Sequence, residues 1–174
     1  YNLVIDKTLV TPASNAWSVT LSSPGRTEVS TDQANRLCDI RGNLLINEGK
    51  YNYYRYKARL YGNYTSYGTS LGDAINTGRV TLENGSSQHQ VTGSTSSTID
   101  FGDVELNDAQ GALLNTSIST NNFYLTAGVF DIGTYNLAIN GSVSGSAYST
   151  TKMIQCYGSP ASQGVTLSLS LSGN

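Results

Sequence analysis

Hydrophobic residues in this chain alternate with polar residues in short runs, which is the period of a half-buried β-strand. The clearest run is residues 165–171, where a valine and three leucines occupy the odd positions and hydroxyl residues the even ones. Turn-forming residues separate such runs roughly every 8–12 positions, a spacing typical of all-β sandwiches and barrels. The pattern therefore predicts many short strands.

About ten such runs occur along the chain, which predicts a single Ig-like or jelly-roll β-sandwich over residues 1–174. We expect at most one or two short helical turns. The best helical candidate is residues 30–40, where Thr31 can cap a first turn. Trp17 alternates in phase with Val19, so we expect it in the core. No repeat of fixed period stands out.

Glycines predict a hairpin and a bulge within this sandwich. The Asn-Gly pair at position 84 is a strong tight-turn signal, so residues 79–82 and residues 88–92 are expected to be partner strands. Residues 99–106 form another β-stretch, and Gly102 within it predicts a β-bulge.

The most unusual stretch is residues 51–69, which combines tyrosines with basic residues and contains no acidic residue. With a period of two, its even positions form an apolar face and its odd positions an aromatic and cationic face. Tyrosine offers flat apolar area with a hydroxyl, and arginine adds donors for carboxylates and sugar hydroxyls. We therefore predict one long amphipathic strand whose odd face binds a ligand. The predicted contact residues are Tyr51, Tyr53, Arg55, Arg59 and Tyr61, with Tyr64 and Tyr67 in the following loop.

A structural interpretation of the same stretch stays open beside this one. Tyrosine is a good strand former, and another element of the fold could cover the odd face. The even positions Tyr54, Tyr56, Ala58 and Leu60 would then serve the core in either case.

Composition narrows the partners and the location. Charged residues make up 13% of the chain, about half of the usual share, whereas hydroxyl and amide residues are plentiful. Such a surface is common in secreted and cell-surface β-proteins, so we expect an extracellular location. The net charge of −2 gives no reason to expect nucleic acid or an anionic membrane as a partner. No apolar run approaches the roughly 18 residues that a membrane span needs.

The two cysteines, Cys38 and Cys156, predict one disulfide made in an oxidising compartment. Because the bridge would close most of the chain into one loop, the chain-entropy model gives it about 4–5 kcal/mol. The alternative is two separate buried thiols.

Catalytic motifs are absent from the sequence. The one histidine, His89, stands in a polar run and is expected at the surface, without a recognisable nucleophile or zinc spacing to accompany it. Four carboxylates lie close together at Asp100, Asp103, Glu105 and Asp108. Calcium binding and a glycosidase carboxylate pair are alternatives there, but solvated strand and turn carboxylates are favoured. We therefore expect no enzyme activity, cofactor or metal.

The tyrosine-rich stretch resembles the late strands of Gram-negative chaperone–usher pilus subunits. In that family an aromatic and basic strand precedes a variable loop, a glycine and a strand that alternates Val and Thr. The matching positions here are Tyr54, Tyr56, Ala58, Arg59 and Leu60, followed by Gly78, Val80 and Leu82. Residues 104–114 are also similar to the internal hairpin of such subunits. Since a long segment follows these strands, the resemblance implies the receptor-binding domain of a pilus tip adhesin, with other pilus subunits and a periplasmic chaperone as partners.

These observations predict an extracellular, non-catalytic adhesin domain that binds a host glycan or glycoprotein receptor at the tip of a fimbrium. The first alternative is a structural, self-assembling subunit of a pilus, fibre or capsid, in which residues 165–171 would matter more than the tyrosines. The second alternative is a carbohydrate-active enzyme.

Overall fold

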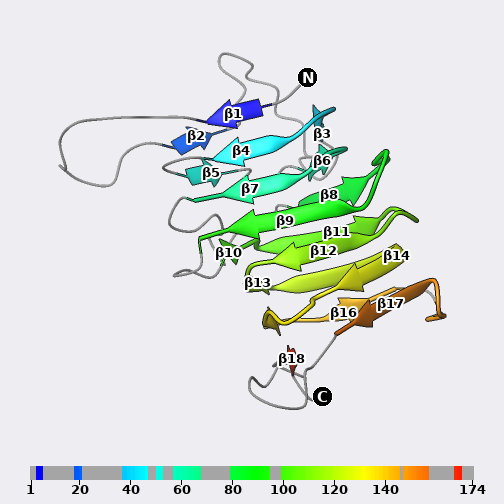
Figure 1. The fold of residues 1–174 in the computed structure, drawn as a ribbon. Helices are drawn as coiled ribbons and strands as arrows, with labels where there is room; N and C mark the ends of the chain where they lie inside the picture. Colours follow the sequence, from blue (N-terminus) through cyan, green and yellow to red (C-terminus); the bar gives the residue numbers. More distant parts are fainter. Residues whose placement is uncertain are drawn as a thin grey trace, which may run out of the picture.

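The computed structural model describes residues 3–5, 18–20, 37–46, 50–52, 57–67, 79–94, 99–145, 147–156 and 167–169 of the chain. These residues contain 18 strands and form coils that stack along one axis (Figure 1). Within these ranges no helix is long and apolar enough to cross a membrane. The all-β class predicted from the alternation is therefore confirmed.

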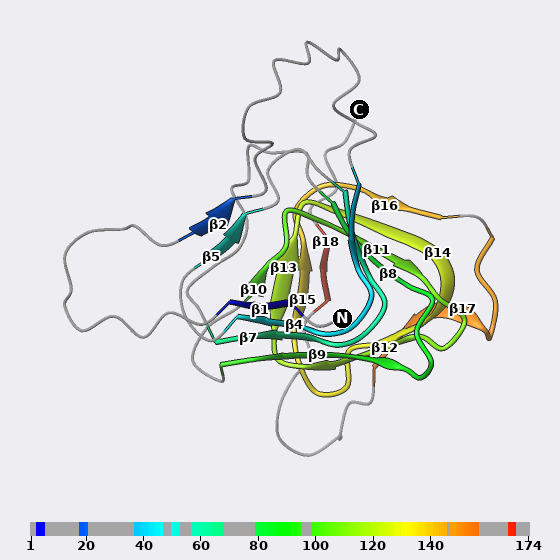
Figure 2. The same ribbon diagram turned by 90° about the horizontal axis from the view of Figure 1, so that it is seen from above.

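From residue 79 onward, the described coils visit three faces of the molecule in the same order, as the view along the axis shows (Figure 2). The first face contains β3 (Leu37–Ile40), β6 (Lys57–Leu60), β8 (Arg79–Glu83), β11 (Asp103–Asn107) and β16 (Val143–Ser144). The second face contains β1 (Leu3–Ile5), β4 (Leu44–Ile46), β7 (Tyr64–Ser66), β9 (His89–Gly93), β12 (Ala112–Asn115) and β17 (Lys152–Gln155). The third face contains β10 (Ile99–Asp100), β13 (Ile118–Thr120), β15 (Leu137–Ile139) and β18 (Leu167–Leu169).

Two further features complete the framework. The long strand β14 (Asn122–Asp131) belongs to both the first and the second face, because its beginning pairs with β11 and its end with β12. It turns the corner at Gly128, whose φ of 84° suits a residue without Cβ. A separate pair joins β2 (Ser18–Thr20) to β5 (Lys50–Asn52).

All of these strand pairs are parallel, and each joins a strand to its counterpart one coil away. This architecture is a β-solenoid of about four turns. The prediction of an Ig-like or jelly-roll β-sandwich was wrong, because sandwiches are built from antiparallel strands joined by hairpins and Greek keys. The spacing of turn residues was correct, but the turns are corners between faces.

The predicted hairpins show this difference directly. The strand β8 pairs with β6 and β11, whereas β9 pairs with β7 and β12, so the two runs beside Asn84 are not partners. Residues 104–114 likewise contain β11 and β12, which pair with different neighbours. At Gly102, with a φ of 54°, the chain turns from the third face to the first instead of forming a bulge.

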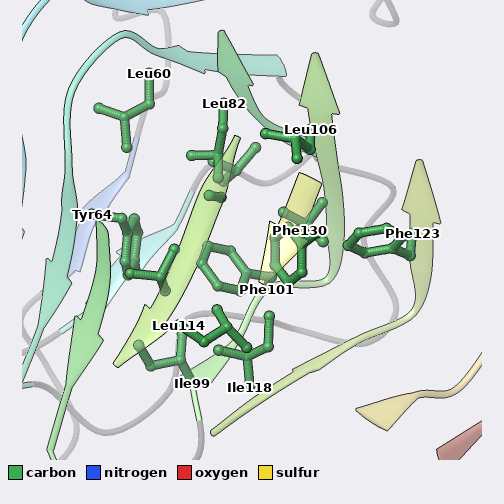
Figure 3. Packing of buried hydrophobic residues seen from close by; sticks show 14 of the residues in the cluster. Leu60, Tyr64, Leu82, Ile99, Phe101, Leu106, Leu114, Ile118, Phe123 and Phe130 are labelled. Atoms are coloured by element: carbon green, nitrogen blue, oxygen red, sulfur yellow. The ribbon is translucent and has the colours of Figure 1, made fainter. Parts of the chain in front are cut away.

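The core is a set of side-chain stacks that run along the axis. In the first face Ile40, Leu60, Leu82, Leu106 and Leu125 occupy the same register position on consecutive strands. All five are buried, and Figure 3 shows three of them on neighbouring coils. Aromatic rings fill the centre: Tyr64 lies against Phe101 with ring centroids 4.8 Å apart. Burial of these side chains is the main stabilising contribution that the coils share.

Two expectations about particular residues also change. The predicted disulfide is wrong: Cys156 is an exposed free thiol. The strands β6, β8, β11 and β14 separate the coil of Cys38 from the coil of Cys156. With a strand spacing of about 4.8 Å, that distance is far beyond the 7 Å limit for a disulfide. The helical candidate at residues 30–40 ends in strand β3, while its earlier part and Trp17 lie outside the described residues.

Candidate functional site

Charged side chains gather on the outer side of the first face, because alternate residues of its strands point away from the core. We call this surface the charged face. Its charged residues are Asp39, Lys57, Arg59, Arg79, Glu83, Asp103 and Glu105. The outward positions of the other faces carry few charges and mix polar residues such as Thr65 and Gln90 with apolar ones such as Leu45 and Leu113, so this surface differs from the rest of the described exterior.

Parallel in-register pairing places like positions of successive coils directly beside one another. Asp39, Arg59, Thr81, Glu105 and Tyr124 form one such row across five strands. Neighbouring positions in the row are one strand spacing apart, about 4.8 Å. The row therefore places an acid, a base, a hydroxyl, an acid and an aromatic ring at a regular interval.

One end of the row is an ion-pair cluster around Arg59. Its Nε and Nη2 atoms donate to the two carboxylate oxygens of Asp39 at 2.7 and 2.8 Å, and its Nη1 lies 3.5 Å from Glu83. Hydrogen bonding to Asp39 raises the pKa of the Arg59 guanidinium. About a third of each side chain in the Arg59–Asp39 pair remains exposed, so solvent and ligands can reach both charges.

The other end of the row is organised around Glu105. Arg79 Nη1 and the Thr81 hydroxyl donate to Glu105 Oε2 at 2.8 and 3.3 Å, and the Thr126 hydroxyl donates to Oε1 at 2.8 Å. The Arg79 guanidinium also lies 3.5 Å above the centroid of the Tyr124 ring, a cation–π contact. Glu105 therefore has a donor on each oxygen, and the cluster is held in one arrangement.

The predicted contact residues are distributed over several elements and do not form one strand. Arg59 lies on the charged face, Tyr61 is half-buried at the following corner, and Tyr67 is 53% exposed at the end of β7. Tyr51 belongs to β5, which pairs with β2 and is part of another sheet. Tyr53 and Arg55 lie outside the described residues.

Tyr64 requires a correction, because it is fully buried in the core and cannot contact a ligand at the surface. Its ring packs on Phe101 (Figure 3), and burial raises the pKa of its phenol. The nearby Ser66 hydroxyl partly offsets this rise in the phenol pKa. The two hydroxyls do not form a hydrogen bond, so the Tyr64 hydroxyl has no hydrogen-bond partner among the described residues. Ala58 and Leu60 are buried as predicted.

A second polar cluster lies at the corner between the first and second faces. His89 is 1% exposed, which overturns its predicted surface position. Its Nδ1 lies 2.7 Å from the Gly62 carbonyl of one adjacent coil, and its Nε2 lies 3.0 Å from Asp108 Oδ2 of the other. Burial raises the pKa of Asp108, but hydrogen bonds from the Gln110 and Gly85 amides and from His89 outweigh it and lower that pKa overall.

The four clustered carboxylates have separate roles. Asp100 lies on the third face, where it accepts the Gly102 amide and burial raises its pKa. Asp103 accepts two hydrogen bonds from Asn122, and Asp108 belongs to the His89 corner. Among the described residues no group of three or more His, Cys, Asp or Glu side chains could hold a metal ion. Asp100 and Glu105 also lie on different faces, so they cannot act as a paired set.

Sequence reasoning missed Arg79, Tyr124 and the His89 corner. A signal for the stacking was present: Gly42-Asn43 and Gly62-Asn63 precede strands β4 and β7 at equivalent positions of consecutive coils. The Asn43 side chain accepts the Asn63 amide at 2.7 Å, so this short repeat is a contact between coils.

Comparison of the chain with protein-family models, with curated proteins and with solved structures gave no match. The site is therefore interpreted from its own chemistry.

Proposed function

We propose that this chain is an extracellular adhesion module that binds a glycan along the charged face, without catalysing a reaction. The observation that carries the proposal is the row from Asp39 to Tyr124. Its accessible members Asp39, Arg59, Glu105 and Tyr124 place donors, acceptors and an aromatic ring on a fixed backbone, while Thr81 between them is buried. Ligands with many hydroxyls need such alternating donors and acceptors, and a surface that is already ordered loses less entropy on binding.

The balance of charge favours a neutral glycan over a polyanion. The cations Lys57, Arg59 and Arg79 stand beside four carboxylates on the same side of the strands, of which Asp39 and Glu105 are accessible and Glu83 and Asp103 are buried. Arg59 and Arg79 are also engaged by Asp39 and Glu105, so a polyanion would have to displace these carboxylates. A neutral sugar can instead bridge an arginine and its carboxylate, because each hydroxyl both donates and accepts.

The pilus context implied by the resemblance stays a prediction, and the present proposal does not depend on it. The resemblance depended on one long strand and on a hairpin, and the structure shows strands in separate sheets and a corner in their place. The proposal depends on the charged face and on the low-charge, hydroxyl-rich exterior.

A glycan array tests the proposal with the unchanged protein and the variants Lys57→Ala and Arg59→Ala. We expect each variant to weaken binding to the recognised glycan about tenfold or more, the usual effect of losing a charge-assisted hydrogen bond. Lys152→Ala on β17 is the matched control, because it removes a lysine from the second face. Unchanged binding by both charged-face variants would exclude this surface.

Self-assembly remains a second candidate, and one observation favours it. Among the described residues β18 is the last strand of the third face, and it pairs only with β15. A strand with one free edge can add a strand from another molecule. Sedimentation of the protein with and without residues 164–174 distinguishes the two functions: polymers that depend on concentration and on this segment support assembly, and a stable monomer supports adhesion.

A further inference from the structure

The His89 corner fixes where protons must lie. A carbonyl oxygen can only accept, so the 2.7 Å contact to Gly62 requires a proton on Nδ1 of the ring. The 3.0 Å contact to Asp108 then requires a second proton between Nε2 and Oδ2. Either the imidazole carries both protons, or Asp108 is a neutral acid that donates to Nε2.

The surroundings of Asp108 favour its ionised form. Its Oδ2 accepts the Gly85 amide as well as the His89 contact, and its Oδ1 accepts the Gln110 amide at 2.9 Å. Both oxygens are thus occupied as acceptors, as in a carboxylate, and these hydrogen bonds lower its pKa. The second proton therefore belongs to the ring, which makes His89 a buried imidazolium beside a carboxylate.

Three consecutive coils meet at this ring. Gly62 precedes β7, His89 begins β9 and Asp108 precedes β12, and these strands are neighbours in the second face. Gly85, which donates to Asp108, leaves no room for change: a Cβ there would lie 3.0 Å from both Asp108 Oδ2 and His89 Nε2. Gly85, Asp108 and His89 Nε2 are therefore in close contact, and no larger side chain fits at position 85.

We propose that His89 is a pH-sensitive switch, which holds these three coils together only while both of its ring nitrogens carry protons. When the ring loses a proton, a nitrogen lone pair faces either the Asp108 carboxylate or the Gly62 carbonyl. Because His89 and Asp108 are 1% and 7% exposed, water cannot satisfy that lone pair unless the corner opens. Rising pH therefore loosens the corner locally, while the apolar stacks stay in place.

Three charged groups on neighbouring strands have contacts elsewhere. Arg59 and Glu83, on β6 and β8, lie close to each other on the charged face. Asp131, on β14, accepts the Gly133 amide. Among the described residues Asp108 is the one charged group in contact with the ring. At the acid limit the switch also fails, because protonation of Asp108 removes the acceptor; its lowered pKa places that loss below the ordinary aspartate range.

The chain has one histidine, so its imidazole signals need no assignment. Nitrogen-15 NMR of the folded protein would follow both ring nitrogens during a pH titration, and amide exchange would follow Gly85 and Gln110 on the same samples. We expect both ring nitrogens to be protonated at the acidic start of the titration. In the interval where the ring loses a proton, protection of these two amides should fall about tenfold, the effect of one unsatisfied buried group. Protection of the Leu125 amide, in the first face, should not change.

Asp108→Asn is the comparison variant: an NH₂ at the Oδ2 position can donate to an unprotonated Nε2 but cannot accept the Gly85 amide, so the Gln110 amide is the readout in this variant. We expect its ring to lose the proton at lower pH than in the unchanged protein, and amide protection to stop following that titration. A single neutral tautomer with Nδ1 protonated throughout the pH range would overturn the proposal. So would unchanged protection across the titration, or identical titrations in the two proteins. The first two outcomes need no variant, and none of them bears on glycan binding.

Discussion

The inner and outer sides of the first face are made by alternate residues of the same strands, yet they differ in polarity and in the contacts that hold their side chains. On the inside, Leu60, Leu82 and Leu106 stack with no exposed surface. On the outside, Arg59, Thr81 and Glu105 stack in the same register but are polar. Arg59 donates to Asp39, and Thr81 donates to Glu105. Because the backbone is common to both, the comparison separates what burial contributes from what polar stacking contributes.

The free energy gained by burying an apolar side chain depends on neither a direction nor a particular partner. Any aliphatic side chain of similar size can therefore occupy the inner stack. The outer row depends on geometry, because each arginine must find its carboxylate one coil away. Exposed ion pairs contribute little to stability, about 0–1 kcal/mol. The outer row is thus available for recognition at small cost to the fold, and the inner stack is not.

The largest effect is expected where backbones of neighbouring coils touch directly. Gly128 has a φ of 84°, and a Cβ there would overlap the Asp108 carbonyl oxygen. Backbone strain and overpacking each cost about 1–3 kcal/mol, so Gly128→Ala should lower the free energy of unfolding by about 2–6 kcal/mol. Urea denaturation measures it.

Gly133→Ala is the control for that variant. Its φ is also positive, at 54°, but the nearest atom to a Cβ would be 3.6 Å away, an ordinary contact. We expect a loss of about 1 kcal/mol from strain alone. Equal losses at the two glycines would show that the contact between coils is unimportant.

The inner stack should give the next largest effect. Leu106→Ala removes a fully buried side chain from the middle of the row, and such changes cost about 2–5 kcal/mol. The neighbouring Asn107→Ala acts on the exposed side of the same strand and should change stability by less than about 0.5 kcal/mol. A large loss at Asn107 would contradict the division between the two sides.

The same division explains which features of the fold could be predicted. Alternation in residues such as 57–60 and 137–139 correctly indicates strands with one buried side, because it records only the direction of side chains. It contains no information about which strand lies next to which. Parallel pairing between coils 18 to 41 residues apart and antiparallel pairing in a hairpin need the same alternation, so a sandwich and a solenoid look alike.

The candidate site was less predictable for a related reason. Arg59 was identified from its sequence neighbours, but its structural partners Asp39 and Glu83 are one coil away on each side. His89 appeared exposed because its sequence neighbours are polar, whereas its environment comes from Gly62 and Asp108. In a solenoid the neighbours that define a site are one coil apart, and a local sequence window excludes them.

One buried hydroxyl in the second face, that of Tyr64 on β7, extends the comparison. The Tyr64 hydroxyl is fully buried with no hydrogen-bond partner among the described residues. An unsatisfied buried hydroxyl costs about 1–3 kcal/mol, so Tyr64→Phe should raise the free energy of unfolding by about 1 kcal/mol while the ring keeps its contact with Phe101. Denaturant midpoints at constant m-value test this. A loss of stability would indicate that the hydroxyl has a partner after all.

The smallest effect is expected in the outer row, and it needs a double-mutant cycle. Arg59→Ala and Asp39→Ala each remove one partner of a bidentate pair that is about a third exposed. Solvent screens such a pair, so the coupling energy between the two changes should be about 0.2–1 kcal/mol and should fall as salt is added. Measured by urea denaturation of all four proteins, a coupling above about 2 kcal/mol would mean that the outer row supports the fold as the inner stack does. A small coupling, together with a large loss of glycan binding in Arg59→Ala, would assign this pair to recognition.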